Sequence, residues 1–177
     1  ASGYFNLGGF ALVANELDKL AGVRLLLGAE PPLEGRVMPV TLGERSGPDA
    51  EKKLLNKQLA LQEEGLKRDR DLTDFSEASE SQVQRLIAMQ RAGKLRVKRF
   101  KFPPFLHAKA FILSEGEGVF VGSSNFTYSG LRKNLELNVS RKDPEPYEKA
   151  RRWFEELWNR SEDYDLARLY ADRFVPH

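Results

Sequence analysis

The chain has 177 residues and a formal net charge of +2, with 41% hydrophobic and 31% charged residues. This is the balance of an ordinary globular protein, and the length suffices for one domain with its own hydrophobic core. No apolar stretch approaches the length of a membrane span, and the N-terminus has neither the basic start nor the apolar run of a signal peptide. We therefore expect a cytoplasmic protein without a membrane partner.

Residue types that bind transition metals are scarce. Cysteine is absent, and histidine occurs only as His107 and His177. This excludes disulfides and nearly every zinc site, because zinc takes Cys or His ligands in sets of three or four. No clustered acidic motif indicates a magnesium site, although composition alone leaves a carboxylate-held ion open. We predict chemistry without a metal ion or another cofactor.

The first half of the chain combines helical patterns with one buried strand. Apolar spacing predicts a helix over 10–21, followed by a strand over 23–27 whose continuous apolar run is typical of burial on both faces. The proline- and glycine-rich segment 30–48 predicts a long loop. Charged, helix-prone patterns over 49–70 and 79–92 predict two helices that could pack on the sheet or form a dimer surface. The inner side of the first helix would carry Leu12, Val13, Leu17 and Leu20.

The second half predicts four strands in close succession and one long helix. The strand patterns cover 94–100, 107–114, 119–122 and 135–141, and 115–118 has the composition of a hairpin turn. Asp143 and Pro144 are a typical N-cap and first helical residue. The apolar stripe of this last helix is better explained as core than as a base-stacking platform: Tyr147, Ala150, Phe154, Leu157 and Trp158. Helices alternating with strands, and the absence of an internal linker, predict one α/β domain over 1–177.

A block of positive charge precedes and enters the strand at 107–114. Between residues 92 and 114 there are six basic residues and no acidic one. Such a block indicates a polyanionic partner, although a solvated strand and loop is an equally good explanation of the block alone. Lys94, Arg96 and Lys98 alternate on one strand face and could guide a nucleic-acid backbone.

Three short motifs follow in order. His107 and Lys109 lie two residues apart on one face of a strand, and a buried lysine needs a partner such as a phosphate. Gly122-Ser-Ser-Asn125 offers donors to the same anion, although the motif alone is better explained as an ordinary turn. In 134–138, Glu136 could orient His107 by a hydrogen bond, or could lie on the wet side of a strand whose leucines are buried.

Together, His-x-Lys, Gly-Ser-x-Asn and Asn-x-Glu resemble the signature of the phospholipase D superfamily. The resemblance implies an α/β sandwich with a mixed central sheet and helices on both faces. It implies that His107 is the nucleophile, that Lys109 and Asn125 bind phosphate with Ser123 as a supporting donor, and that Glu136 orients the histidine. The family also has an aspartate five positions after the lysine, where this chain has Ser114.

A weaker likeness covers Gly3-Tyr4-Phe5, Gly8-Gly9-Phe10 and 23–28, and looks like the phospholipase D-like domains of bacterial helicases and restriction-type nucleases. It implies a module of a larger protein that acts on nucleic acid, with DNA favoured over RNA. Cleavage by this route needs two histidines, and the chain has one motif, so we expect a homodimer that shares its site. The alternatives are a nucleic-acid-binding module without turnover, which Ser114 favours, and hydrolysis of lipid or another phosphodiester.

Overall fold

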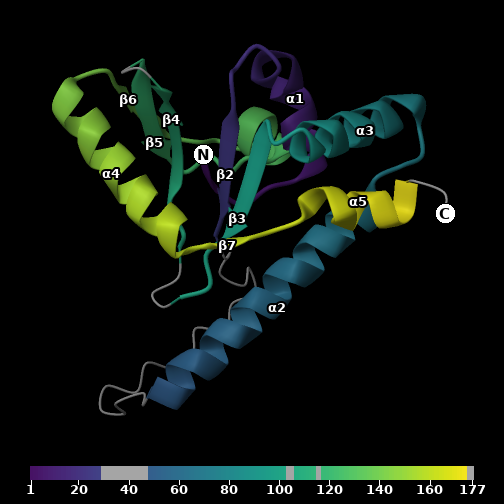
Figure 1. The fold of residues 1–177 in the computed structure, drawn as a ribbon, viewed down its shortest axis with the longest axis horizontal. Coiled ribbons are helices and arrows are strands. Elements are labelled where there is room, and N and C mark those ends of the chain that lie inside the picture. The colour runs from purple at the N-terminus through teal and green to yellow at the C-terminus, as the bar shows by residue number, and fades with distance from the viewer. Residues whose placement is uncertain (29–47, 103–105, 115–116, 175–177) are drawn as a thin grey trace.

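Seven strands form one mixed β-sheet in the computed structural model, which describes residues 1–28, 48–102, 106–114 and 117–174 (Figure 1). The order across the sheet is β6-β5-β4-β1-β2-β3-β7. β1, β2 and β3 are parallel, and every other neighbouring pair is antiparallel. The strands are β1 (Ser2–Gly3), β2 (Val23–Leu27), β3 (Leu95–Arg99), β4 (Lys109–Leu113), β5 (Gly118–Gly122), β6 (Asn138–Arg141) and β7 (Glu162–Asp163).

Helices cover both faces of this sheet. The helices are α1 (Leu7–Leu17), α2 (Pro48–Leu72), α3 (Glu77–Arg91), the π-helix η2 (Ser129–Lys133), α4 (Pro144–Arg160) and α5 (Leu166–Phe174). In β2, Leu26 packs in a cluster with two aromatic residues of α4, whereas Leu25 and Leu27 pack in the cluster formed with α1, α3 and α5. All three leucines are at most 1% exposed, and each contributes about 2 kcal/mol of hydrophobic stabilisation. The prediction of a mixed sheet with helices on both faces is confirmed.

Most predicted elements are found with small shifts of their ends. The strand over 23–27 and the helices over 49–70, 79–92 and from Pro144 are confirmed. The aromatic stripe of α4 belongs to the core, since Tyr147, Phe154 and Trp158 are at most 8% exposed. The predicted loop over 30–48 lies outside the described residues as far as residue 47, and Pro48 begins α2.

The first helix begins three residues earlier than predicted and ends four residues earlier. Asn6 caps its start, where the side-chain Oδ1 accepts a hydrogen bond of 2.8 Å from the Gly9 N–H. Glycine at position 9 lets the helix lie directly against another segment, because a Cβ there would be 2.6 Å from the Phe126 carbonyl oxygen. Leu20, predicted to be buried, lies beyond the helix and is 44% exposed.

The prediction for 135–141 is wrong in two respects. β6 begins only at Asn138, and the apolar side chains of this segment are exposed rather than buried. Leu135 is fully exposed, Leu137 is 77% exposed and Val139 is 57% exposed. β6 is the last strand at its edge of the sheet in the described part of the chain, and Leu135 and Leu137 lie before it in the sequence.

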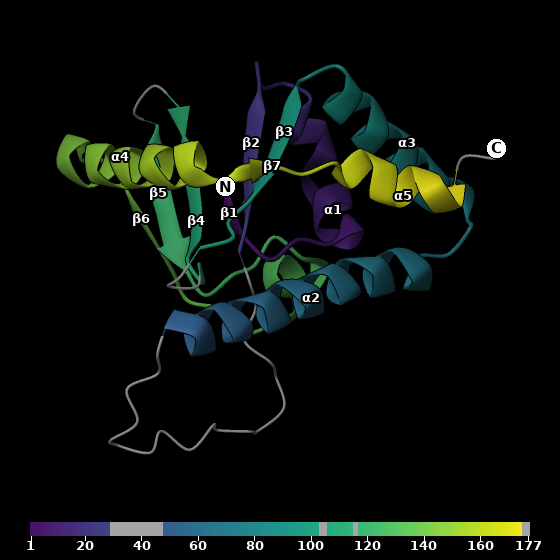
Figure 2. The same cartoon turned by 60° about the horizontal axis from the view of Figure 1, so that its bottom comes forward.

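The long helix α2 crosses the end of the sheet where β2 and β3 finish (Figure 2). Gln62 of α2 donates a 2.5 Å hydrogen bond to the Gly28 carbonyl, directly after β2. Arg99, at the end of β3 and 8% exposed, donates to the Gln62 side chain at 2.5 Å, to Glu63 at 2.9 Å and to the Leu59 carbonyl. These bonds fix α2 above the strand ends.

We expect the Arg99→Met substitution to lower the free energy of unfolding by about 3 kcal/mol, because it removes the donor to the Gln62 side-chain oxygen and the cation that pairs with Glu63. Urea denaturation followed by circular dichroism measures this. Arg91→Met is the matched control: Arg91 forms an ion pair of 3.1 Å with Asp165, but its side chain is 56% exposed. Its substitution should cost less than about 1 kcal/mol. Equal losses in the two variants would contradict the role given to Arg99.

Candidate active site

His107 and Lys109 lie side by side at the start of β4. The Lys109 Nζ is 2.7 Å from Nε2 and 3.1 Å from Nδ1 of the imidazole, and it donates to the His107 carbonyl at 3.1 Å. The ammonium group donates in these contacts, and Nε2, the nearer ring nitrogen, is placed to accept. His107 is exposed and Lys109 is half-buried, which corrects the expectation of a buried lysine in mid-strand. The predicted pairing of the two side chains is confirmed.

Asn125 faces the same pocket from a different segment of the chain. Its Oδ1 accepts a hydrogen bond of 3.2 Å from the Tyr4 N–H. This contact assigns the oxygen end of the amide and leaves the NH₂ end as the donor for an anion. Asn125 lines, together with His107 and Lys109, a pocket whose empty volume is about 170 Å³, partly open to solvent. The other lining residues are Gly3, Tyr4, Gly28 and Leu106.

Glu136 is held by Ser123 of the Gly-Ser-x-Asn motif and by Asn134 of its own Asn-x-Glu motif. The Ser123 hydroxyl donates to its carboxylate, and the Asn134 Nδ2 donates at 3.1 Å. These two hydrogen bonds, and then the positive charge of Lys109, lower the pKa of Glu136 below the usual range. The predicted bond from His107 is not among the hydrogen bonds of the described residues: Glu136 binds Ser123 and Asn134, and His107 binds Lys109.

Substituting Ser123 with alanine should raise the pKa of Glu136 towards the ordinary carboxyl value, since the largest cause of the shift is removed. As the pH falls, the variant carboxylate should therefore be protonated at a higher pH than in the parent protein. Carboxyl carbon NMR titration measures the shift directly. Ser124→Ala is the control, because the neighbouring hydroxyl accepts from Asn138 at 2.7 Å and does not bind Glu136. An unchanged titration in Ser123→Ala would contradict this assignment.

Ser114 lies far from the histidine and lysine. It follows the last residue of β4, while Lys109 is the first. The four residue steps from Lys109 to Leu113 alone span about 13 Å, and Ser114 is one step further, so the position that holds aspartate in the family lies well outside contact with the pocket at Lys109. A serine here removes no group from the immediate surroundings of the imidazole. Ser114 therefore gives the binding-only alternative less weight than it has in the sequence.

The basic residues predicted to bind nucleic acid have partners within the chain, and two of them, Arg96 and Lys98, lie on the α4 side of the sheet. Lys94 donates to the Asp18 carbonyl at 2.6 Å. Lys98 donates to the Trp158 carbonyl at 3.2 Å, and both it and Arg96 lie over the Trp158 ring, at 5.3 and 5.9 Å from its centre. None of the three basic side chains lines the pocket at His107, so their predicted role in binding is not tested by this geometry.

Several neighbours of the pocket were not predicted as site residues. Gly3 has a φ of 144°, a conformation suited to glycine, and a Cβ there would lie 3.5 Å from the Asn125 Oδ1. Tyr4 and Leu106 supply backbone and side-chain walls. Sequence signals existed for Gly3, Tyr4 and Gly28, which lie in the segments of the weaker likeness, and for Asn134, which stands two residues before Glu136 in the motif. Residues in the turns next to strand ends line the pocket without any sequence periodicity that would identify them.

The described residues contain no cluster of three or more His, Cys, Asp or Glu side chains suited to a metal ion. Among the helices of residues 1–28, 48–102, 106–114 and 117–174, none is long and apolar enough to cross a bilayer.

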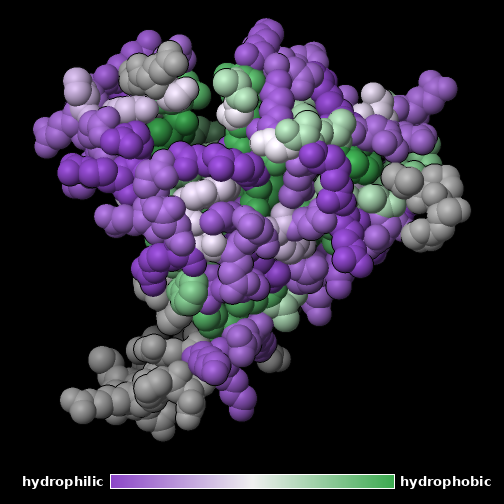
Figure 3. Space-filling model, in the orientation of Figure 1, coloured by the Kyte–Doolittle hydropathy of each residue, from purple (hydrophilic) through white to green (hydrophobic). Residues whose placement is uncertain are grey.

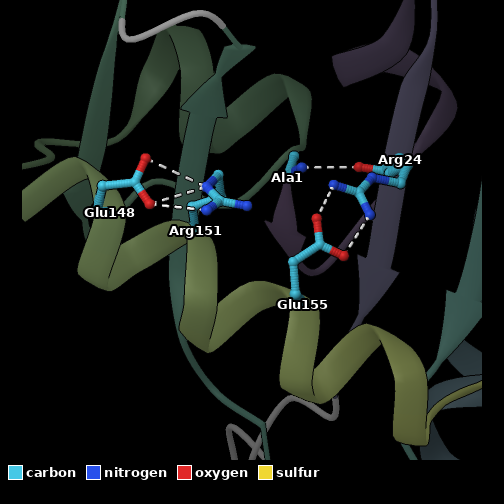
Figure 4. Close-up of polar contacts among 5 residues, drawn as sticks. All are labelled: Ala1, Arg24, Glu148, Arg151 and Glu155. Atoms are coloured by element: carbon cyan, nitrogen blue, oxygen red, sulfur yellow. Dashed lines mark hydrogen bonds and ion pairs between the residues drawn. The ribbon is translucent and has the colours of Figure 1, made fainter.

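A larger hollow lies at the opposite ends of β2 and β4, with an empty volume of about 920 Å³ that includes space open to solvent. Figure 3 shows hydrophobic residues, in green, between the part of the molecule formed by β4 to β6 and the part formed by β2 and α1. Its two arginines already have carboxylate partners (Figure 4): Arg24 binds Glu155 at 2.5 and 2.9 Å, and Arg151 binds Glu148 at 2.8 Å. The hollow therefore lacks the donors and the nucleophile of the pocket at His107.

Comparisons with known proteins agree with this site. The family model described as "Cardiolipin synthase, PLD-like domain" matches residues 18–158, a span that includes all three motifs. No curated protein matches the chain at a significant level. Nuc from Salmonella typhimurium, a phospholipase D family member of known crystal structure, is 17% identical; the match covers 93% of this chain and 78% of that one, with a TM-score of 0.48. That score is too low to add to what the family model establishes. The chain belongs to the phospholipase D-like family.

Proposed function

We propose that the chain is a metal-independent phosphodiesterase that cleaves nucleic acid, with DNA favoured over RNA, through a phosphohistidine intermediate. The observation that carries the proposal is the pocket in which the imidazole of His107, the ammonium of Lys109 and the amide of Asn125 converge. These groups supply a nucleophile and two donors for the non-bridging oxygens of a phosphodiester. Membership of the family supports this chemistry, and the basic block over 92–114 supports a polyanionic substrate.

The reaction needs one attacking and one protonating group. The unprotonated nitrogen of His107 attacks phosphorus, so that a P–N bond forms and the P–O bond to the leaving group breaks. A second, protonated imidazole gives its proton to the leaving oxygen. Water then attacks the phosphohistidine and gives its proton to the second imidazole, which the first step left neutral; the P–N bond breaks and His107 is released. Lys109 and Asn125 stabilise the charge on the non-bridging oxygens in both steps.

The second imidazole comes, in this proposal, from another copy of the chain. The described residues of one chain contain a single histidine, His107, because His177 lies outside them. Exposed apolar side chains border the site, since Leu135 and Leu137 flank Glu136 in the sequence and Val139 pairs with Val121 of β5. Large exposed apolar residues beside a polar site are typical of a protein interface. They support a homodimer with a two-fold axis beside His107.

The deciding experiment is the cleavage of end-labelled single- and double-stranded DNA and RNA in excess EDTA. The expected result is metal-independent cuts, with the preferred substrate shown by the comparison of the four probes. Binding that weakens steeply with salt, but without cuts, would instead support a nucleic-acid-binding module. Release of head groups from phospholipid vesicles, with all four nucleic acids intact, would overturn the proposal in favour of lipid hydrolysis.

A further inference from the structure

A half-exposed aromatic residue lies under an arginine where the chain leaves β3. Phe102 is 40% exposed and packs against the buried Phe100, with the ring centres 5.9 Å apart at 67°. The Arg160 guanidinium, at the end of α4, lies 5.6 Å from the centre of the Phe102 ring and 5.7 Å from the centre of the Phe100 ring. No carboxylate of the described residues lies within 4.0 Å of that guanidinium. An aromatic face and an uncompensated cation are therefore presented together.

This aromatic–arginine pair is linked to the proposed reaction centre by one hydrophobic cluster. Phe102 packs on Phe100, and Phe100 belongs to the same cluster as Leu106, the residue directly before His107. Leu106 itself lines the pocket. The cluster therefore extends from the aromatic pair to the wall of the pocket.

The surroundings of Phe102 carry a small excess of positive charge. Lys98 and Arg96 lie nearby along β3 on the α4 side, and Lys101 follows Phe100 in the chain. Two carboxylates oppose them: Glu162 pairs with Lys101, and Asp163 is the β7 neighbour of Lys98. Arg160 adds a fourth cation, and Glu155, which is within electrostatic reach of Arg96, already pairs with Arg24. The positive charge of Arg96 and Lys98 is therefore followed along the chain by that of Lys101, beside the aromatic pair.

We propose that Phe102 and Arg160 form a subsite that stacks one unpaired base of a single-stranded nucleic acid whose backbone enters the pocket at His107. Bases of single strands stack on exposed aromatic rings regardless of sequence, and an arginine beside the ring strengthens the contact. Bases inside a duplex have no free face to offer. This inference rests on the proposed function for the backbone in the pocket and adds a preference for single strands.

The chain contains a matched pair for comparison. Phe75 is 66% exposed, packs at 5.1 Å on Phe174 and lies 4.7 Å from the Arg173 guanidinium. Its arginine, however, is also bound to the Arg70 carbonyl and lies 3.8 Å from Asp71. Phe75 and Arg173 therefore form a similar aromatic–arginine pair, but the charge of Arg173 is compensated and the pair does not line the pocket.

The test measures binding in a His107→Ala background, in which cleavage does not interfere. A fluorescent oligothymidylate of about 12 nucleotides and a duplex of the same length serve as probes. Phe102→Ala should weaken single-strand binding by about tenfold and leave duplex binding within about twofold, since one stacked base is lost. Phe102→Tyr should retain binding, and Phe75→Ala should match the parent. Melting temperatures identify any variant that is misfolded.

Equal losses for both probes, or no loss for either, would overturn the subsite. The result is independent of turnover, which separates it from the proposed function. If the chain cuts nothing in EDTA but the effect of Phe102→Ala appears, the subsite stands and the nuclease proposal fails. If metal-independent cuts appear and Phe102→Ala binds both probes as the parent does, the nuclease proposal stands and the subsite fails.

Discussion

Replacing His107 with alanine is expected to lower the rate of phosphodiester cleavage by at least about 10³-fold while leaving the fold intact. The side chain is exposed and its hydrogen bonds are to Lys109, so its removal leaves no cavity and no unsatisfied buried group. The loss therefore reports the chemistry rather than unfolding. End-labelled substrate in excess EDTA measures the rate, and thermal melting checks the fold.

A second measurement separates a nucleophile from a group that only positions the substrate. Rapid quenching in alkali should trap substrate label on the wild-type protein, because phosphohistidine is a covalent N–P adduct, and His107→Ala should carry none. Labelling each end of the substrate in turn shows which fragment is held. A variant that still cuts at more than a tenth of the wild-type rate, or that still acquires label, would refute the assignment of His107.

The sequence predicts the elements of this site better than their contacts. His107 and Lys109 are two residues apart, so any extended backbone brings them near each other, and the structure confirms the pair. Asn125 is sixteen residues further along the chain, and only the pairing of β4 with β5 brings its segment back to the pocket. The contact of Asn125 with Tyr4, which spans 121 residues, has no local pattern that predicts it.

The error at 135–139 has a different cause. Alternation of apolar and polar residues predicts that the apolar face is covered, but it does not say whether the cover belongs to the same chain. In β2 the cover is intramolecular, since Leu26 packs on α4. At the β6 edge no helix or strand of the described chain shields Leu135 and Leu137 from solvent. The apolar alternation at 135–139 wrongly predicted burial within the chain, and the same exposed side chains are the strongest support for the proposed second copy.

Substituting Leu137 with aspartate should therefore convert the proposed dimer to monomers. In a two-fold interface each substitution occurs twice, and each buried, unpaired carboxylate costs about 3 kcal/mol, so dimerisation should weaken by about 10⁴-fold. Sedimentation velocity at micromolar concentration measures the change. Leu72→Asp is the matched control, because Leu72, at the end of α2, is 75% exposed against 77% for Leu137. A wild-type chain that is monomeric under these conditions would contradict the shared site.

Loss of cleavage in Leu137→Asp has two explanations, since Leu137 follows Glu136 and its N–H donates to Ser123. They differ in how the rate depends on protein concentration. If the second imidazole comes from a partner, the rate for the weakened dimer should rise with the square of the concentration, because two chains must meet to complete one site. If the substitution only disturbs Glu136, the rate should stay proportional to the concentration. A square dependence in Leu137→Asp, with proportionality in Leu72→Asp, would place one His107 of each copy in a common reaction centre.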